Sequence, residues 1–120
     1  MASILIVDDE FDFAELIGEL LEMRGHTVVV AINGVSGLAL LNSGSFDLVI
    51  SDVMMPIMTG PEMVAAMRGT PRLAATPVIM MSGEPKLLSQ AISHGTAQAV
   101  LRKPFGPGAL YAEVDRFLAA

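Results

Sequence analysis

The feature that most constrains this chain is a repeated alternation of short apolar runs with helix-periodic stretches along all 120 residues. The runs are rich in β-branched residues, and each has the length of one buried strand. They predict strands at residues 4–7, 28–32, 48–51, 78–82 and 97–101. Strands that are apolar throughout and separated by helices are typical of a parallel sheet covered on both faces. We therefore expect a doubly wound α/β fold.

The stretches between these runs carry helix signals. The first has apolar residues at i, i+3, i+4, i+7 and i+8, namely Phe13, Leu16, Ile17, Leu20 and Leu21. Gly25 is expected to end this helix as its C′ residue. Further helices are predicted at about residues 35–41, 61–68 and 85–94, and from residue 107 onward. No repeat or linker interrupts the pattern, so residues 1–120 are expected to form a single domain without an output domain.

Composition excludes several classes of function. A net charge of −6 argues against a nucleic-acid surface, which would need clustered Lys and Arg. No apolar run approaches the length of a membrane span, and the first residues lack the basic region of a signal peptide. The absence of cysteine excludes a disulfide scaffold, a thiol nucleophile and any cysteine-ligated metal. A cytoplasmic protein is the expectation.

Polar residues follow four of the predicted strands at the point where each strand ends. Asp8 and Asp9 come after the first strand, Asp52 after the third, Ser82 at the end of the fourth, and Lys103 after the fifth. In open parallel sheets, functional residues gather at this edge. Taken singly, each has a simpler interpretation as a helix cap, a loop hydroxyl or a surface charge. Their joint placement favours a common site.

The chemistry of this set suits phosphoryl transfer. Neighbouring carboxylates repel one another, and a bound cation relieves that repulsion. Oxygen ligands without His or Cys favour Mg²⁺ over Zn²⁺. Lys103 adds a compact positive charge, and Ser82 adds a hydroxyl. Phosphoryl transfer demands mainly positioning and neutralisation of charge, which these residues could supply.

Over essentially its whole length, the chain resembles the receiver domain of two-component response regulators, in particular the chemotaxis regulators. Four segments carry the resemblance: Ile-Leu-Ile-Val-Asp-Asp-Glu at 4–10, Asp-Leu-Val-Ile-Ser-Asp-Val-Met-Met-Pro at 47–56 with Gly60, Val-Ile-Met-Met-Ser-Gly at 78–83, and Lys-Pro-Phe at 103–105. It implies a flavodoxin-like (βα)5 three-layer sandwich with strand order 2-1-3-4-5.

The resemblance also implies the reaction. Asp52 would accept a phosphoryl group from a phosphohistidine on a histidine kinase or histidine phosphotransfer protein. Mg²⁺ would be bound directly by Asp9, Asp52 and the backbone carbonyl of Met54, with Asp8 acting through water. The chain would be a phosphoacceptor in a phosphorelay and no enzyme, beyond self-catalysed transfer and autodephosphorylation.

Within the same resemblance, Ser82 and Lys103 would hold the phosphoryl oxygens. A downstream protein would read the change on the face formed by the helix at 85–94, the strand at 97–101 and the last helix. Val100 departs from the family pattern, because a rotating Tyr or Phe usually stands three residues before the lysine. Valine is too small and too stiff at χ1 for that rotation. We therefore expect the Ser82 loop and the helix at 85–94 to carry the signal.

Met54 and Glu84 occupy positions that, in this family, flank the path of the attacking water. They would shield the aspartyl phosphate or repel hydroxide; equally, they would be plain surface residues. Two other functions compete. A Mg²⁺-dependent phosphohydrolase of the haloacid dehalogenase type also uses an aspartate nucleophile, but it requires a second Asp where Met54 stands. A receiver-like docking domain that is never phosphorylated would have no need of the intact polar set.

Overall fold

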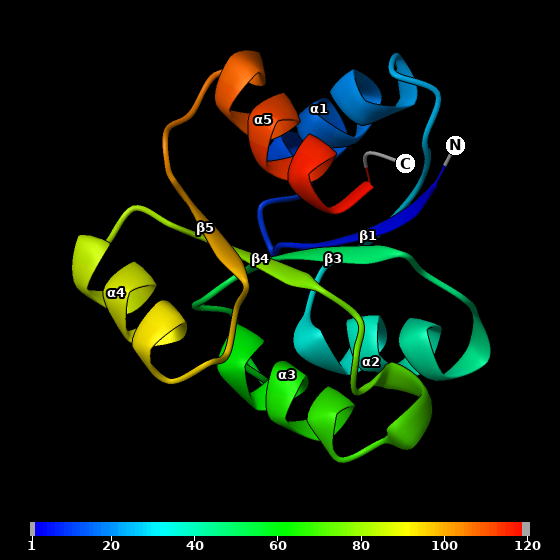
Figure 1. Ribbon diagram of the computed structural model, residues 1–120, viewed down its shortest axis with the longest axis vertical. Coiled ribbons are helices and arrows are strands. Elements are labelled where there is room, and N and C mark those ends of the chain that lie inside the picture. The colour runs from blue at the N-terminus through cyan, green and yellow to red at the C-terminus, as the bar shows by residue number, and fades with distance from the viewer. Residues whose placement is uncertain (1, 119–120) are drawn as a thin grey trace.

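The computed structural model describes residues 2–118 and is built around one five-stranded parallel sheet (Figure 1). The strands are β1 (Ser3–Val7), β2 (Thr27–Ala31), β3 (Leu48–Asp52), β4 (Val78–Ser82) and β5 (Ala99–Arg102). The helices are α1 (Phe11–Glu22), α2 (Gly34–Ser43), α3 (Gly60–Arg68), α4 (Pro85–Ser93) and α5 (Pro107–Leu118), with a 3-10 turn η1 at Pro71–Leu73. The strand order β2-β1-β3-β4-β5 confirms the predicted doubly wound, flavodoxin-like fold.

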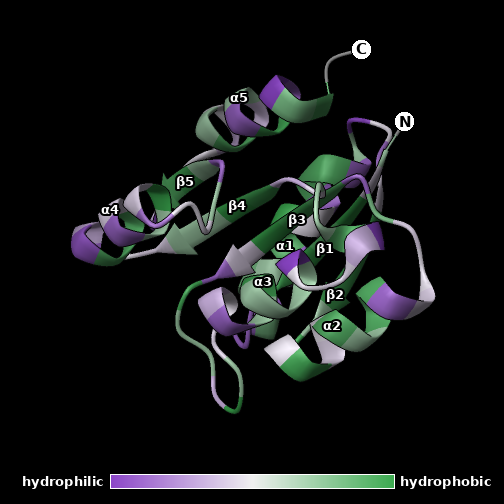
Figure 2. Cartoon of the chain, turned by 60° about the horizontal axis from the view of Figure 1, so that its bottom comes forward, coloured by the Kyte–Doolittle hydropathy of each residue, from purple (hydrophilic) through white to green (hydrophobic). Residues whose placement is uncertain are grey.

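Helices cover both faces of the sheet. Figure 1 shows α1 and α5 on one face and α2, α3 and α4 on the other. Along β1, Ile4 and Ile6 pack into the α1/α5 layer, whereas Leu5 and Val7 pack into the opposite layer. Because both faces are buried, the strand can be apolar at every position. Figure 2 shows mainly hydrophobic residues along the strands, whereas the helices and loops combine hydrophobic and hydrophilic residues.

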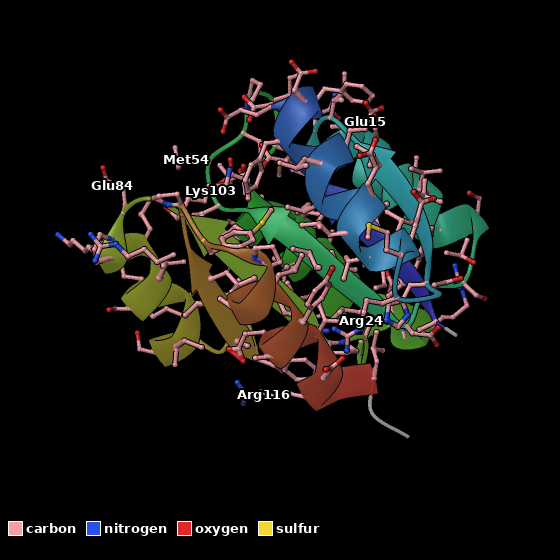
Figure 3. The ribbon with its side chains drawn as sticks, turned by 90° about the horizontal axis from the view of Figure 1, so that it is seen from above. Glu15, Arg24, Met54, Glu84, Lys103 and Arg116 are labelled. Atoms are coloured by element: carbon pink, nitrogen blue, oxygen red, sulfur yellow. The ribbon has the colours of Figure 1, made fainter. Side chains whose placement is uncertain are left out.

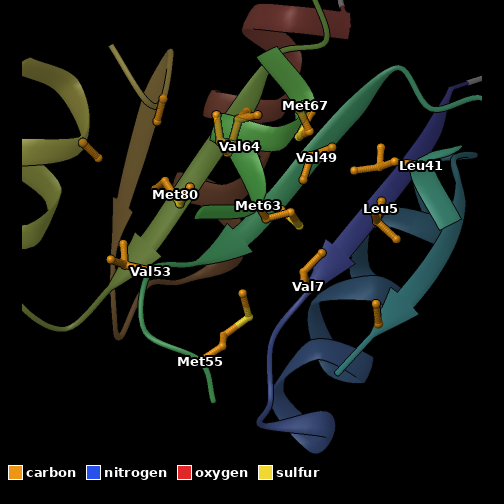
Figure 4. Close-up of a cluster of buried hydrophobic side chains, with 14 of the residues drawn as sticks. Leu5, Val7, Leu41, Val49, Val53, Met55, Met63, Val64, Met67 and Met80 are labelled. Atoms are coloured by element: carbon orange, nitrogen blue, oxygen red, sulfur yellow. The ribbon is translucent and has the colours of Figure 1, made fainter. Parts of the chain in front are cut away.

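Methionine fills much of the core on the α2–α4 side. Met63 and Met67 of α3 meet Met80 of β4 and the neighbouring aliphatic side chains of β1 and β3 (Figure 4). All three methionines are fully buried. Their flexible thioether chains suit an irregular space between helix and sheet.

The predicted bounds shift slightly at every strand except β4, which spans residues 78–82 as predicted. β1 begins at Ser3 and β2 at Thr27, each one residue earlier than predicted, and β3 ends at Asp52, one residue later. β5 begins at Ala99, because the N–H of Ala97 still donates to the carbonyl of Ala91 at the end of α4. Gly25 follows α1 with a φ of 90°, as its predicted role as C′ residue requires.

The start of α3 is fixed by a capping box. Thr59 accepts a hydrogen bond from the N–H of Glu62 at 3.2 Å, and the Thr59 N–H donates to the Glu62 carboxylate at 2.9 Å. This helix start sets where the β3–α3 loop must end. Within residues 2–118, no helix is long and apolar enough to cross a membrane.

Candidate functional site

The candidate site lies at the carboxyl edge of the sheet, where parallel pairing aligns the strand ends. Asp52 is the last residue of β3 and pairs with Met81 of β4, one residue before Ser82. The N–H of Lys103 donates to the carbonyl of Ser82 at 2.9 Å, which ties the end of β5 to the end of β4. Asp8 follows β1 directly, and its N–H donates to the carbonyl of Ala31 in β2.

Lys103 lies at the centre of the site. Its Nζ is 2.8 Å from Asp8 Oδ2, 3.3 Å from Glu10 Oε1 and 3.5 Å from Asp52 Oδ2. Asp8 is fully buried, and the side chains of Lys103 and Asp52 are 16% and 13% exposed. The structure therefore brings together Asp8, Asp52 and Lys103 from three separate strand ends.

Burial and charge alter the acidity of these groups. Burial raises the pKa of Asp52 to about 6 with help from the charge of Asp8, although Lys103 and a hydrogen bond from the Val53 N–H oppose the rise. Burial lowers the pKa of Lys103, but its hydrogen bond to Asp8 and the charges of Asp52 and Asp8 outweigh burial, so the net shift is upward. Lys103 is therefore a cation beside a carboxyl group whose pKa of about 6 lies above its ordinary value.

The site carries more negative than positive charge. Oxygens of Asp8, Glu10 and Asp52 lie within 4.8 Å of one another. One ammonium group cannot neutralise three carboxylates, and this oxygen-only set matches the preference of Mg²⁺. The residues present therefore fit a hard divalent cation.

Asp9 and Glu10 lie differently relative to the carboxylate cluster. Asp9 is exposed and, among the described residues, does not belong to the group of three converging carboxylates. Glu10 does, because its N–H donates to Asp8 Oδ1 at 2.9 Å and this turn directs the chain back over the site. Sequence reasoning missed Glu10. Its place beside Asp8 and Asp9 in one acidic run was the available signal.

The β3–α3 loop holds its shape through Gly60. A Cβ at this position would collide with the carbonyl oxygen of Asp52, so only glycine permits the close approach. The Gly60 N–H donates to the carbonyl of Val53 at 2.9 Å and closes the loop. Met54 and Ile57 lie on its outer side, 59% and 82% exposed.

The β4–α4 loop presents Ser82 and Glu84. Ser82 is 5% exposed, and its Oγ accepts a hydrogen bond from the Glu84 N–H at 3.0 Å. Glu84 itself is exposed. Figure 3 shows Glu84, Met54 and Lys103 gathered at one end of the sheet, with Arg24 at the other.

Val100 and Phe13 complete the surroundings. Val100 pairs with Met80 in the sheet and is half-buried against the α2–α4 side of the core. Phe13 of α1 packs at the edge of the opposite core, with its ring centroid 4.6 Å from Lys103 Nζ. Sequence reasoning assigned Phe13 only to the apolar face of its helix.

Comparison with known proteins identifies relatives along nearly the whole chain. The family model described as "Response regulator receiver domain" matches residues 4–115. The transcriptional regulatory protein CpxR of Escherichia coli K12 is 39% identical over 119 residues, which cover 98% of this chain and 50% of CpxR. A CpxR homolog of Haemophilus influenzae is 34% identical over 98% of this chain and 51% of its own length. The chain thus spans about half the length of these curated relatives.

Solved structures agree with this result. Chemotaxis protein CheY4 of Vibrio cholerae matches with a TM-score of 0.90 and 36% identity, over 98% of this chain and 99% of CheY4. Response regulator protein TrrA of Thermotoga maritima matches with a TM-score of 0.88 and 31% identity, over 98% of this chain and all of TrrA. The TrrA structure is a complex with Mg²⁺ and BeF.

Proposed function

This chain belongs to the response regulator receiver domain family of two-component signal transduction, and from that premise we propose that Asp52 is its phosphoacceptor. The observation that carries the proposal is the contact set of Asp52. Its carboxylate lies at the end of β3, mostly buried, 3.5 Å from the ammonium group of Lys103. No other carboxylate among residues 2–118 combines a position at the end of the central strand with a cationic neighbour and a raised pKa.

In the proposed reaction, an oxygen of Asp52 attacks the phosphorus of a phosphohistidine on a histidine kinase or histidine phosphotransfer protein. A P–O bond to Asp52 forms while the P–N bond breaks, and the leaving imidazole nitrogen keeps the electron pair and takes up a proton from solvent. Asp52 must be ionised to attack. With a pKa of about 6, it is mostly ionised at neutral pH.

We propose Mg²⁺ as the cofactor, because three carboxylates converge on a single ammonium group. Asp52, Asp8 and the carbonyl of Met54 are the proposed ligands, together with Asp9, the exposed residue that follows Asp8 in the chain. Mg²⁺ would neutralise charge on the transferring phosphoryl group. Glu10 is a further carboxylate within reach of the same position.

Ser82 and Lys103 are the proposed phosphoryl-binding residues. Lys103 already lies beside Asp52, so the ammonium group can shift from Asp8 toward a phosphoryl oxygen with little movement. The Ser82 hydroxyl, now an acceptor for the Glu84 N–H, can donate to another phosphoryl oxygen. That donation draws the β4–α4 loop toward Asp52.

We propose that a downstream protein reads this movement on the face formed by α4, β5 and α5, in a cytoplasmic phosphorelay. With Val100 half-buried in the usual switch position, the Ser82 loop and α4 carry the change. A direct nucleic-acid contact by this domain is not proposed, because the net charge is −6.

Hydrolysis of the aspartyl phosphate is the second reaction we propose, with Met54 and Glu84 as its modulators. Both are exposed beside the site, where an apolar chain and a carboxylate would hinder an approaching water or hydroxide. Replacing Glu84 with Ala should therefore speed dephosphorylation. Equal dephosphorylation rates in the two proteins would remove Glu84 from this role.

Intact-mass analysis after incubation with acetyl phosphate and Mg²⁺ tests the phosphoacceptor. We expect one added phosphoryl group on the wild type and none on Asp52→Asn. An adduct on both proteins would place the acceptor elsewhere, and an adduct on neither would favour a docking domain that is never phosphorylated. Turnover of generic phosphomonoesters would favour the phosphohydrolase.

A further inference from the structure

An aromatic ring lies against the ammonium group of Lys103. The Phe13 ring centroid lies 4.6 Å from Lys103 Nζ, within the range of a cation–π contact. Phe13 in turn meets Phe105, with ring centroids 5.6 Å apart and planes at 80°, an edge-to-face pair. Phe105 lies two residues after Lys103, so Phe13 contacts the lysine and the loop that carries it.

At this site, the position of the lysine ammonium group must be fixed by a neighbouring side chain such as Phe13. Its four-carbon stem is flexible, and its charge has no preferred direction. Three carboxylates compete for Lys103 at 2.8, 3.3 and 3.5 Å, and the Glu10 carboxylate is the most exposed of them at 68%. A neutral π face attracts the cation without offering a fourth ion pair. It therefore restricts the ammonium group to the side that faces Asp8 and Asp52.

Packing alone does not account for Phe13. Its side chain is only half-buried at the margin of the α1/α5 core, and its ring meets Phe105 and the Lys103 ammonium group rather than the centre of that core. A leucine would offer no attraction to the ammonium group.

We propose that Phe13, braced by Phe105, is the positioning residue that holds Lys103 toward the phosphoacceptor. The inference rests on the proposed function of Asp52 and Lys103. It adds that the first turn of α1 controls the lysine through an aromatic face. A small shift of a charge-stabilising group costs a large factor in rate, so loss of the ring should slow phosphoryl transfer while leaving the carboxylates intact.

Lysine acylation measures the positioning without any phosphoryl chemistry. The chain has two lysines, Lys103 and the exposed Lys86, so limited acetylation followed by peptide mass analysis gives an internal ratio. In Phe13→Leu, the Lys103:Lys86 labelling ratio should rise about threefold or more, because the ammonium group loses its contact with the aromatic ring. Phe13→Tyr retains the ring and should keep the wild-type ratio.

Phosphorylation supplies the second measurement. With acetyl phosphate and Mg²⁺, Phe13→Leu should reduce the rate about tenfold, and Phe13→Tyr should restore most of it. Mg²⁺ affinity by calorimetry should stay within about twofold of wild type in both variants, since the carboxylate ligands are unchanged.

Tyr111→Leu is the matched control. The Tyr111 ring centroid lies 4.3 Å from the Arg24 guanidinium carbon, and the Tyr111 hydroxyl donates a hydrogen bond to the carbonyl of Leu20. These contacts lie in the same α1/α5 interface but away from the site. Its loss should lower stability and leave both the labelling ratio and the phosphorylation rate unchanged.

Each of these measurements can contradict the proposed role of Phe13. Unchanged labelling and rate in Phe13→Leu would overturn the inference. So would an equal effect of Tyr111→Leu, because Phe13 would then act only through stability. If the wild type takes no phosphoryl group, the proposed function fails, and the labelling ratio alone still decides whether Phe13 positions Lys103.

Discussion

The folded protein disfavours ionisation of the Asp52 carboxyl group. Burial and the neighbouring Asp8 raise its pKa from 3.8 to about 6, against the opposing effect of Lys103. A carboxyl whose pKa is higher in the folded state than in the unfolded chain binds its proton more tightly when folded. Stability from this residue is therefore largest below pH 3.8 and is lost as pH rises toward 6. Above that, the ionised group destabilises the metal-free fold.

Replacing Asp52 with Asn should remove this penalty. In the presence of a chelator, we expect Asp52→Asn to be more stable than wild type at pH 8, with a gain that shrinks through pH 6 and disappears near pH 4. Urea unfolding at the three pH values measures the gain. A gain of the same size at all three would mean that the titration of Asp52 is not its source.

The backbone of Ile57 is strained. It has a φ of 73°, a conformation that is costly for a β-branched residue, and its side chain is 82% exposed. Ile57→Gly should stabilise the protein by about 0.5–1 kcal/mol, the relief of left-handed strain less the entropy cost of glycine. Urea unfolding measures the change.

Ile92 provides the matched control for this substitution. It is 47% exposed in α4, where its backbone is helical. Ile92→Gly should destabilise, because glycine is a poor helix former. Destabilisation by both substitutions would show that the backbone of Ile57 stores no strain.

Residues at the site differ in how far the sequence could reveal them. Asp52, Ser82 and Lys103 could be found because each stands at the end of an apolar strand. Phe13 could not be assigned to Lys103, since the two lie 90 positions apart and meet only when α1 packs beside the β5–α5 loop. The strain at Ile57 was equally hidden, because nothing in an isoleucine predicts a positive φ.

At the scale of elements, α3 depends on its first turn. Thr59→Ala removes the side-chain cap on the N–H of Glu62 and should cost about 1 kcal/mol of stability. Thr59→Ser retains the hydroxyl and should recover most of the loss. Urea unfolding of the two variants compares them. If alanine and serine destabilise equally, the loss comes from the threonine methyl group and not from the cap.

Local signals predicted the elements well, and long-range contacts account for the rest. Gly25 located the end of α1, for example. No element was predicted between residues 68 and 78, where the structure has the turn η1. Its Arg72 donates to the carbonyls of Leu41 and Gly44 at the end of α2, 2.6 and 2.9 Å away, a contact that no local pattern contains.

At the scale of the whole molecule, α4 is a lightly anchored helix that follows the Ser82 loop. Only Leu88 and Ala91 of its residues are buried, and its N-terminus has no side-chain cap. A cavity of about 250 Å³ separates it from the β3–α3 loop and the start of α3, lined by Val53, Met54, Thr59, Pro61, Leu87, Gln90, Ala91, His94 and Thr96. An element with few buried side chains beside unfilled space is one that a charge at the sheet edge can shift.

Amide hydrogen exchange with and without Mg²⁺ and fluoroberyllate, a phosphoryl analogue, tests this division of roles. We expect exchange in α4 and in the Ser82–Glu84 loop to change on binding. Ala91→Leu places a larger side chain in the cavity and partly fills it. This substitution should weaken the exchange response, because it holds α4 in place.

Val100→Ala removes most of the side chain at the usual switch position and should leave the response of α4 intact, because valine has no ring to rotate. The opposite pattern, with the response lost in Val100→Ala and retained in Ala91→Leu, would return the switch to β5. Equal binding of the analogue by all three proteins is the control, since both substitutions lie outside the carboxylate cluster and its lysine. Under that condition, a difference in exchange reports how the fold transmits the charge on Asp52 rather than how much ligand is bound.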